Sequence, residues 1–249
     1  MPKSPPRVGA ASTPQQNSVP TCANSGAKFR VRLGQDLPTT TLLTGEDNLV
    51  RCGWCGDDPE YVRYHDSEWG RPVVADQLLF EKICLEGFQS GLSWLTILRK
   101  RAAFRRAFEN FDPVRVAEFD SKDVDRLMQD AGIVRHRGKI EAVIQNARST
   151  LVVQSKLGSL RGLVWSFCDE IKLGGGWSAP QRTTDIKART PQSEALSKAL
   201  RGFGFKFVGP TTMYAAMQSL GLVNDHFEGC HVRQDCQNER EIALTKMRA

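Results

Sequence analysis

From about residue 51 onward the sequence is a succession of amphipathic segments, most of which open at a residue that favours the start of a helix. The segment from Arg137 to Leu151 is typical, because its apolar residues recur at the three- and four-residue spacing of one helix face. Alternation of apolar and polar residues, which indicates a strand, is almost absent. We therefore predict an all-α fold in which the apolar helix faces pack together.

The boundaries of the other helices are predicted from capping residues and helix breakers. Helix starts are expected at Ser93, Ser121, Thr190–Pro191 and Gly209–Pro210. The first, second and fourth of these helices are expected to end near Asp112–Pro113, Gly132 and Gly221. Three consecutive glycines at 174–176 are expected to form a loop.

An acidic residue follows an apolar run in the first half of the chain. The run Leu79–Leu85 predicts an amphipathic helix with Asp76 as its N-cap, and Glu86 then lies between apolar neighbours. Burying a carboxylate is costly unless a cation or a hydrogen-bond donor meets it. A Ser-Gly turn and Trp94 follow, so the segment can build a pocket with one acidic contact and one aromatic wall. On residue types alone, a solvated glutamate at a helix end is the alternative.

Composition limits the class of protein. The net charge is +6 and the pI about 9.0, which suits a partner rich in phosphate. No apolar run approaches the roughly 20 residues of a membrane span, and no signal-peptide pattern is present. The seven cysteines are an odd number, which favours reduced thiols in the cytoplasm or nucleus over a disulfide framework.

The N-terminal stretch differs in composition from the rest. Residues 1–48 are rich in Pro, Ser, Thr, Gln and Gly, and we predict a disordered tail there and a helical domain over 49–249. Before Asp36 the tail carries basic residues only, as organelle-targeting segments do, but its prolines disfavour the amphipathic helix of such segments. Its purpose and the compartment stay open.

Cysteine and histidine residues cluster at both ends of the predicted domain. They are Cys52, Cys55, His65, His226, Cys230, His231 and Cys236. These ligand types suit tetrahedral zinc, and the four-residue spacing of His226 and Cys230 places both on one face of a helical turn. Such an ion would tie the two ends of the domain together. The alternatives are inert buried residues, or a redox pair of Cys52 and Cys55 that lacks a βαβ context.

Six separated motifs carry a resemblance to a known family. They are RCGW at 51–54, YHDSEWG at 64–70, EGFQSGLSW at 86–94, GIVRHRGKI at 132–140, GFKFVG at 204–209 and VNDH at 223–226. In their order and spacing the chain resembles the 3-methyladenine DNA glycosylase I family of the helix-hairpin-helix superfamily. The similarity covers about residues 51–236 and leaves the tail outside.

The resemblance implies a helical DNA glycosylase fold with one structural zinc ion. The implied zinc ligands are Cys52, His65, His226 and Cys230. Cys55, His231 and Cys236 then become bystanders close to the ligands. The implied base pocket consists of Trp54, Tyr64, Trp69, Glu86 and Trp94, with Glu86 as the catalytic residue.

The implied reaction is hydrolysis of the N-glycosidic bond of N3-methyladenine in alkylated double-stranded DNA, which leaves an abasic site. A damaged base must leave the stack first, and aromatic faces suit a flipped cationic purine. Glu86 is assigned to recognition and electrostatic positioning, with water activation as a second role. No lysine stands beside Glu86 in its motif as a Schiff-base nucleophile, and no four-cysteine cluster indicates iron–sulfur, so we expect a monofunctional enzyme. We also expect the enzyme to be a monomer.

The stretch from Ser121 to Ala147 is predicted to be a helix, a short turn and a second helix. In the superfamily such a hairpin offers backbone N–H groups to phosphate, which positions DNA without reading its sequence. Positive charge around this turn comes from Arg135, His136, Arg137 and Lys139. Val134 occupies the position where the common hairpin pattern has a second glycine.

Two rival functions remain from other classes. A catalytically silent DNA-damage binder would keep the fold and the zinc, but the intact Glu86 and aromatic set favour an enzyme. A zinc-dependent hydrolase would need an open metal position and commonly a His-Glu-x-x-His motif, which this sequence lacks.

Overall fold

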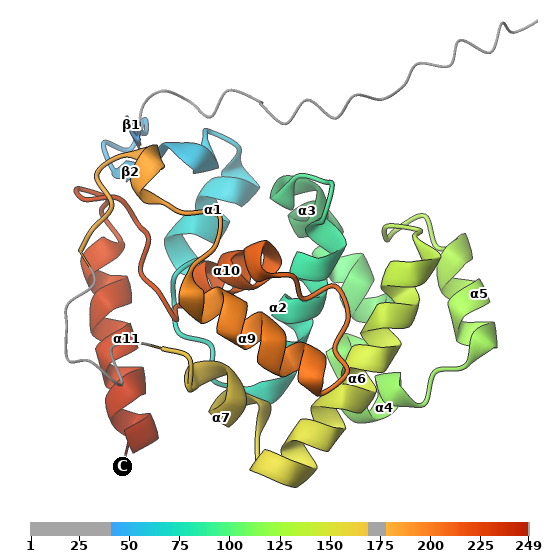
Figure 1. The fold of residues 1–249 in the computed structure, drawn as a ribbon. Coiled ribbons are helices and arrows are strands. Elements are labelled where there is room, and N and C mark those ends of the chain that lie inside the picture. The colour runs from blue at the N-terminus through green and yellow to red at the C-terminus, as the bar shows by residue number, and fades with distance from the viewer. Residues whose placement is uncertain (1–40, 169–177, 249) are drawn as a thin grey trace, which may run out of the picture. The chain divides into compact units, whose positions relative to one another are not determined.

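The computed structural model describes residues 41–168 and 178–248. This part of the chain is predominantly helical, which confirms the all-α prediction (Figure 1). The helices are α1 (Pro59–Ser67), α2 (Asp76–Gln89), α3 (Trp94–Ala107), α4 (Pro113–Ala117), α5 (Ser121–Gln129), α6 (Arg137–Leu157), α7 (Leu160–Trp165), α9 (Pro191–Gly202), α10 (Pro210–Ser219) and α11 (Arg233–Arg248). Single 3-10 turns are η1 (Gly53–Cys55), η2 (Glu109–Phe111) and η3 (Thr183–Asp185).

Helix α2 is the centre of the hydrophobic core. It packs against α3, α6, α7 and α10, and Figure 1 shows it surrounded by them. Leu79, Phe80 and Ile83 are each 1% exposed or less, as their spacing predicts. Each such side chain contributes about 1.5–3 kcal/mol through burial. A rigid central helix therefore carries Glu86 in its last turn.

A short antiparallel hairpin precedes the helices. Strand β1 (Leu42–Thr44) pairs with β2 (Val50–Cys52), with Leu43 opposite Arg51. The prediction had placed residues 41–48 in the disordered tail, and this part of it is wrong. Arg51 stabilises the hairpin, because its Nη2 lies 2.6 Å from Oδ2 of Asp47 and 2.8 Å from Oδ2 of Asp66. Residues 1–40, which contain most of the predicted tail, lie outside the described residues.

Two predicted N-caps are displaced by one residue. Ala75 precedes α2 without a side-chain cap, whereas the carboxylate of Asp76 accepts from the backbone N–H groups of Leu160 at 2.9 Å and Arg161 at 2.7 Å. Asp76 therefore serves the orphan donors of α7, a tertiary contact that local spacing does not reveal. Likewise Asp120, not Ser121, caps α5. The predicted caps Ser93 and Thr190 are confirmed.

The predicted end of α3 is also wrong, and α6 is longer than predicted. Helix α3 stops at Ala107 because Glu109, Asn110 and Phe111 all have positive φ, which an α-helix cannot accommodate. Helices α5 and α10 end at Gln129 and Ser219, two to three residues before their predicted glycines, and Gly221 has the positive φ of a glycine that follows a helix end, so these two predictions are confirmed. Helix α6 begins at Arg137 as predicted but continues to Leu157. The expected loop at 174–176 lies outside the described residues.

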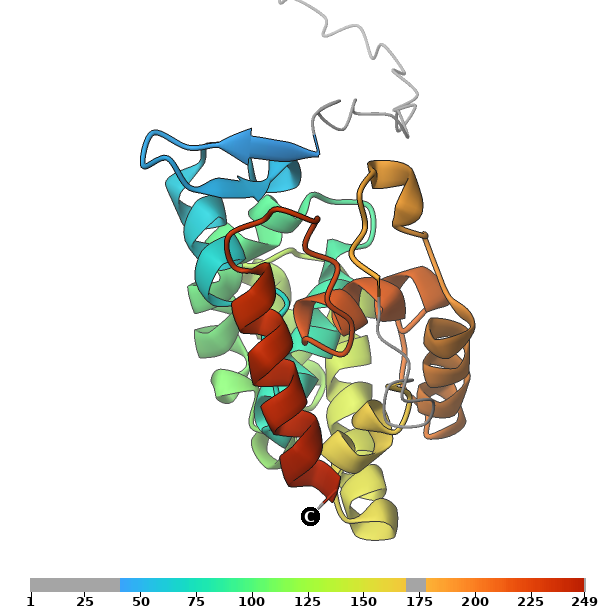
Figure 2. The same cartoon turned by 90° about the vertical axis from the view of Figure 1, so that its left-hand side faces the viewer.

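The two ends of the helical region meet. The loop before α11 runs up to the hairpin, as Figure 2 shows, and the backbone N–H of His231 donates to the carbonyl of Val50 at 2.8 Å. Cys52, Phe227, Cys230, Val232 and Cys236 form a small buried cluster there, apart from the main core. Among the helices described, none is both long enough and apolar enough to cross a membrane.

Candidate active site and metal centre

Four buried side chains from the two ends of the domain converge. Strand β2 supplies Cys52, α1 supplies His65, and the loop before α11 supplies His226 and Cys230. Their ligand atoms all lie within 4.8 Å of one another. Nδ1 of His226 is 3.5 Å from both sulfur atoms, and Nε2 of His65 is 3.5 Å from Sγ of Cys230. These separations match the roughly 3.3–3.8 Å expected between ligands of one tetrahedral zinc ion, so the group can hold a metal.

Hydrogen bonds behind the two imidazoles fix their orientation. Nδ1 of His65 lies 2.7 Å from Oδ1 of Asp66, and Nε2 of His226 lies 3.1 Å from the carbonyl of Trp69. Each ring thus donates outward and turns its other nitrogen toward the sulfur atoms, which is the arrangement of metal-ligating histidines. The His226–Cys230 segment is an irregular turn, not the helical turn expected from its spacing.

The thiols of this group differ in their readiness to ionise. The hydrogen bond from Cys52 and the neighbouring His226 lower the pKa of the Cys230 thiol far below its usual range, whereas that of Cys52 is raised. Burial raises the pKa of Cys55 to about 11 and of Cys236 to about 12. A thiolate is therefore favoured inside the group of four. Cys55 and Cys236 lie beside it as protonated thiols, and His231 contacts Asp66 at 3.1 Å.

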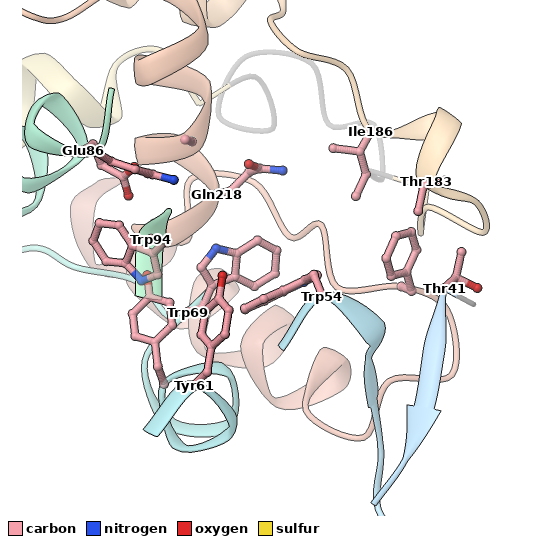
Figure 3. Close-up of a pocket in the computed structure, with 13 residues that line it drawn as sticks. Thr41, Trp54, Tyr61, Trp69, Glu86, Trp94, Thr183, Ile186 and Gln218 are labelled. Atoms are coloured by element: carbon pink, nitrogen blue, oxygen red, sulfur yellow. The ribbon is translucent and has the colours of Figure 1, made fainter. Parts of the chain in front are cut away.

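A cavity of about 320 Å³ adjoins this group (Figure 3). All five residues that the sequence analysis assigned to a base pocket line it. The other lining residues, which that analysis did not assign, are Thr41, Tyr61, Gln89, Thr183, Ile186, Ala215, Gln218 and Phe227. The volume suits a small flat ligand.

Aromatic rings form the walls of the cavity. The rings of Trp54 and Trp69 meet edge to face at 4.9 Å, and those of Tyr64 and Trp94 lie 5.5 Å apart. Tyr61 contacts Trp54 at 5.2 Å and belongs to the same wall. It stands three residues before Tyr64 on α1, so the one-turn spacing is a signal that could have identified it.

Glu86 is the acidic group of the cavity. Its side chain is 4% exposed, and Figure 3 shows it beside Trp94. Ser219 on α10 donates its hydroxyl hydrogen to Oε1 of Glu86 at 2.9 Å. Burial raises the pKa of Glu86, while the Lys82 charge and the Ser219 hydrogen bond oppose that shift. The predicted burial of Glu86 is confirmed. Its hydrogen-bond partner Ser219 is distant in sequence, and no sequence pattern indicated this contact.

One wall of the cavity contacts the four side chains that can hold a metal. We call Cys52, His65, His226 and Cys230 the metal-binding group. The Trp69 ring meets the His226 ring edge to face at 4.7 Å, and the Trp54 ring lies 5.2 Å from that of His65. Helix α1 serves both sites, because Tyr64 faces the cavity and the adjacent His65 faces the sulfur atoms. The aromatic wall therefore packs directly against this group.

The predicted helix-turn-helix is present as α5, a loop and α6, but one of its cations has a different role. Lys139 is buried, and its Nζ donates to the carbonyls of Phe88 at 2.8 Å and Ser90 at 2.6 Å, so it anchors the α2–α3 loop and does not face solvent. Arg135 is exposed, and the backbone N–H groups of Val134 and Arg135 donate to no acceptor within the described residues. Within the described residues, the loop before α6 thus offers backbone N–H groups without an acceptor and the exposed Arg135 guanidinium, which forms no ion pair.

Comparison with known proteins places the chain in a family. The family model for methyladenine glycosylase matches residues 54–234. DNA-3-methyladenine glycosylase 1 of Escherichia coli K12 is 52% identical over 184 residues, which cover 73% of this chain and 96% of the relative. The DNA-3-methyladenine glycosylase of Haemophilus influenzae is 45% identical over 181 residues, with the same shares of 73% and 96%.

Solved structures agree with these relatives. A crystal structure of 3-methyladenine DNA glycosylase I is 49% identical, has a TM-score of 0.69, and is matched over 98% of its chain and 73% of this one. A variant enzyme in complex with 3-methyladenine is 35% identical, also with a TM-score of 0.69, over 97% of its chain and 74% of this one. The chain described here therefore belongs to the methyladenine glycosylase family.

Proposed function

We propose that this protein is a monofunctional DNA-3-methyladenine glycosylase. It hydrolyses the N-glycosidic bond of N3-methyladenine in alkylated DNA and leaves an abasic site. The observation that carries the proposal is a buried carboxylate, Glu86, inside a cavity walled by aromatic rings. The similarity to an enzyme solved in complex with 3-methyladenine supports the same substrate.

Recognition follows from charge and shape. N3-methyladenine in DNA is cationic, and the faces of Trp54, Trp69 and Trp94 attract a cation more strongly than a neutral purine. Glu86 adds a negative charge in a site shielded from water, and its carboxylate accepts from the exocyclic amine of the base. An unmodified base lacks the positive charge, and unstacking it from the duplex costs more free energy than unstacking the damaged base. The pocket therefore selects the lesion.

The reaction needs little acid catalysis, because the base is already a cationic leaving group. As the bond between C1′ and N9 breaks, its electron pair moves into the ring, which departs as neutral 3-methyladenine. Water adds its oxygen to C1′ and releases one proton. Glu86 stabilises the base electrostatically in its departing orientation, and accepting the water proton is its second available role.

We further propose that the metal held by Cys52, His65, His226 and Cys230 is one structural zinc ion. The donor set of two sulfur and two nitrogen atoms suits zinc. Four protein ligands leave no position for a catalytic water, so zinc joins the two ends of the domain and holds α1 in place.

The DNA partner is proposed to be double-stranded and to be bound by a monomer. The unpaired N–H groups of Val134 and Arg135 and the Arg135 guanidinium support a phosphate contact at the α5–α6 loop. The net charge of +6 favours this partner as well. Light scattering of the protein alone and with a duplex tests both statements.

The decisive experiment incubates purified protein with duplex DNA carrying N3-methyladenine and analyses the bases released. We expect free 3-methyladenine and abasic sites that are cleaved only after alkali treatment, because a monofunctional enzyme does not cut the strand. Binding to alkylated DNA without any released base would instead identify a damage-binding protein.

A further inference from the structure

A lysine lies behind the aromatic wall of the cavity. Lys82 on α2 is buried and is absent from the residues that line the cavity. Its Nζ is 2.7 Å from Oη of Tyr64 and 4.7 Å from the ring centroids of both Tyr64 and Trp94. Burying an ammonium group costs free energy, so a nearby negative charge is needed to stabilise it.

The compensating charge is Glu86. Among the groups acting on Lys82 are the carboxylates of Glu68, Glu81 and Glu86 and the guanidinium of Arg101. Two of these carboxylates are already paired, since Nη2 of Arg101 donates to Glu68 at 2.9 Å and Arg105 lies 2.8 Å from Glu81. Glu86 forms no ion pair with an arginine in the described structure and stands one helical turn after Lys82 on the same face of α2.

The groups around Glu86 reinforce this assignment. Helix α1 contributes Tyr61 and Tyr64, whose hydroxyl pKa values are raised by burial, so both are uncharged at neutral pH. Helix α10 contributes the Ser219 hydroxyl, which is neutral. Lys82 is thus the cation that acts on Glu86 within the described residues.

The hydrogen bond to Tyr64 has a second consequence. An ammonium group only donates, so Oη of Tyr64 accepts, and the phenolic hydrogen must point elsewhere. Within the described residues it meets no acceptor, and Nε1 of Trp94, 8% exposed as a residue, also has no partner. Both residues line the cavity. Two unused donors and one carboxylate match the acceptor nitrogens and the exocyclic amine of a purine.

We propose that Lys82 is a positioning residue for base recognition, which keeps the Glu86 carboxylate charged in the empty pocket and orients the Tyr64 hydroxyl as a donor. The inference rests on the proposed function, because it assigns Lys82 a part in that reaction. Lys82 is not a nucleophile in this arrangement, since the rings of Tyr64 and Trp94 cover its ammonium group. Burial lowers the pKa of Lys82 to about 8, so it is still largely charged at neutral pH.

The test compares the pH dependence of kcat/KM for 3-methyladenine excision in Lys82→Met, Lys82→Arg and wild type, with the exposed Lys198→Met as the control for one lost charge. Without Lys82 the pKa of Glu86 rises further, so the acid limb of the Lys82→Met profile should move up by about one pH unit. Excision near pH 6 should fall about tenfold and recover toward pH 8. Lys82→Arg should restore the wild-type limb, and Lys198→Met should not move it.

Other outcomes separate the possible failures. If wild type excises the base and Lys82→Met has an unshifted acid limb, or loses activity equally at every pH, the inference is wrong and the proposed function stands. If the wild-type protein does not excise the base, the proposed function itself is wrong. If Lys82→Met does not fold, Lys82→Gln and an NMR titration of the ¹⁵N-labelled Lys82 ammonium in wild type replace it, and an uncharged Lys82 at pH 7 would overturn the proposal. Borohydride treatment during excision should trap no covalent DNA adduct.

Discussion

The metal-binding group and the aromatic cavity share α1 but differ in how the hydrogen-bonding capacity of their polar atoms is satisfied. In the metal-binding group each imidazole has an outward partner, Asp66 for His65 and the Trp69 carbonyl for His226. In the cavity, Nε1 of Trp94 is buried without a partner among the described residues. A completed network stabilises the fold, whereas an unmet donor costs stability until a ligand arrives. The difference fits the roles proposed above, a structural metal site and a base-binding site.

Removing a cysteine from the metal-binding group should have the largest effect, a loss of stability. Purified protein should contain about one zinc ion per chain, and Cys230→Ser should lower the free energy of unfolding by about 4 kcal/mol or more. Cys236→Ser is the matched control, because Cys236 is also buried nearby but lies outside the group of four. Active, folded wild-type protein without metal would show that the group is not a metal site.

Removing the negative charge of Glu86 from the cavity should lower the excision activity and leave the fold intact. Glu86→Gln keeps the shape but loses the negative charge, so excision should fall by roughly ten- to a thousandfold. Binding to undamaged duplex should barely change, because phosphate contacts lie elsewhere. The exposed Glu118→Gln is the control. Wild-type excision by Glu86→Gln would mean that the base is recognised at another place.

The second layer of the metal site should matter less than its ligands. Asp66→Asn weakens the hydrogen bond that orients His65, so zinc affinity in a chelator competition should fall by about ten- to a hundredfold. Asp47→Asn also loses a contact with Arg51 but touches no ligand, and it should keep wild-type affinity. Equal affinities for both variants would remove Asp66 from the metal site.

The smallest effect is expected from removing the indole N–H of Trp94, which has no hydrogen-bond partner among the described residues. Trp94→Phe removes an N–H without a partner, so stability should change by less than about 1 kcal/mol while excision drops by about three- to tenfold. Trp165→Phe is the contrast, because Nε1 of Trp165 donates to the Val73 carbonyl at 2.9 Å. Thermal unfolding should rank Trp165→Phe as the less stable variant. The reverse ranking would mean that the indole of Trp94 is structural.

The sequence predicted which residues lie together at each of the two sites, but not the contacts that hold them there. Burial of Glu86 followed from its apolar neighbours, and the helical faces followed from spacing. Contacts between segments remote in the chain were not predictable, since no local pattern links Ser219 to Glu86 or Asp76 to α7. Lys82 was overlooked because it precedes the recognised motif by one turn, although that spacing places it on the face of Glu86.

A positive residue therefore requires a tertiary context before its role can be assigned. Lys139 stands in a basic turn and was predicted to add charge there, yet its ammonium is used by two carbonyls of the α2–α3 loop. Arg135, four residues earlier in the same motif, is exposed and forms no ion pair within the described residues. Composition does not distinguish the two, because both are long basic side chains near a turn.

The contact between the indoles and the imidazoles makes the protein its own optical reporter. Trp54 and Trp69 lie about 5 Å from rings of the metal-binding group and also line the cavity. Indole emission depends on its immediate neighbours, so metal removal and base entry should each change the intrinsic fluorescence. Occupancy of either site can then be followed without a label.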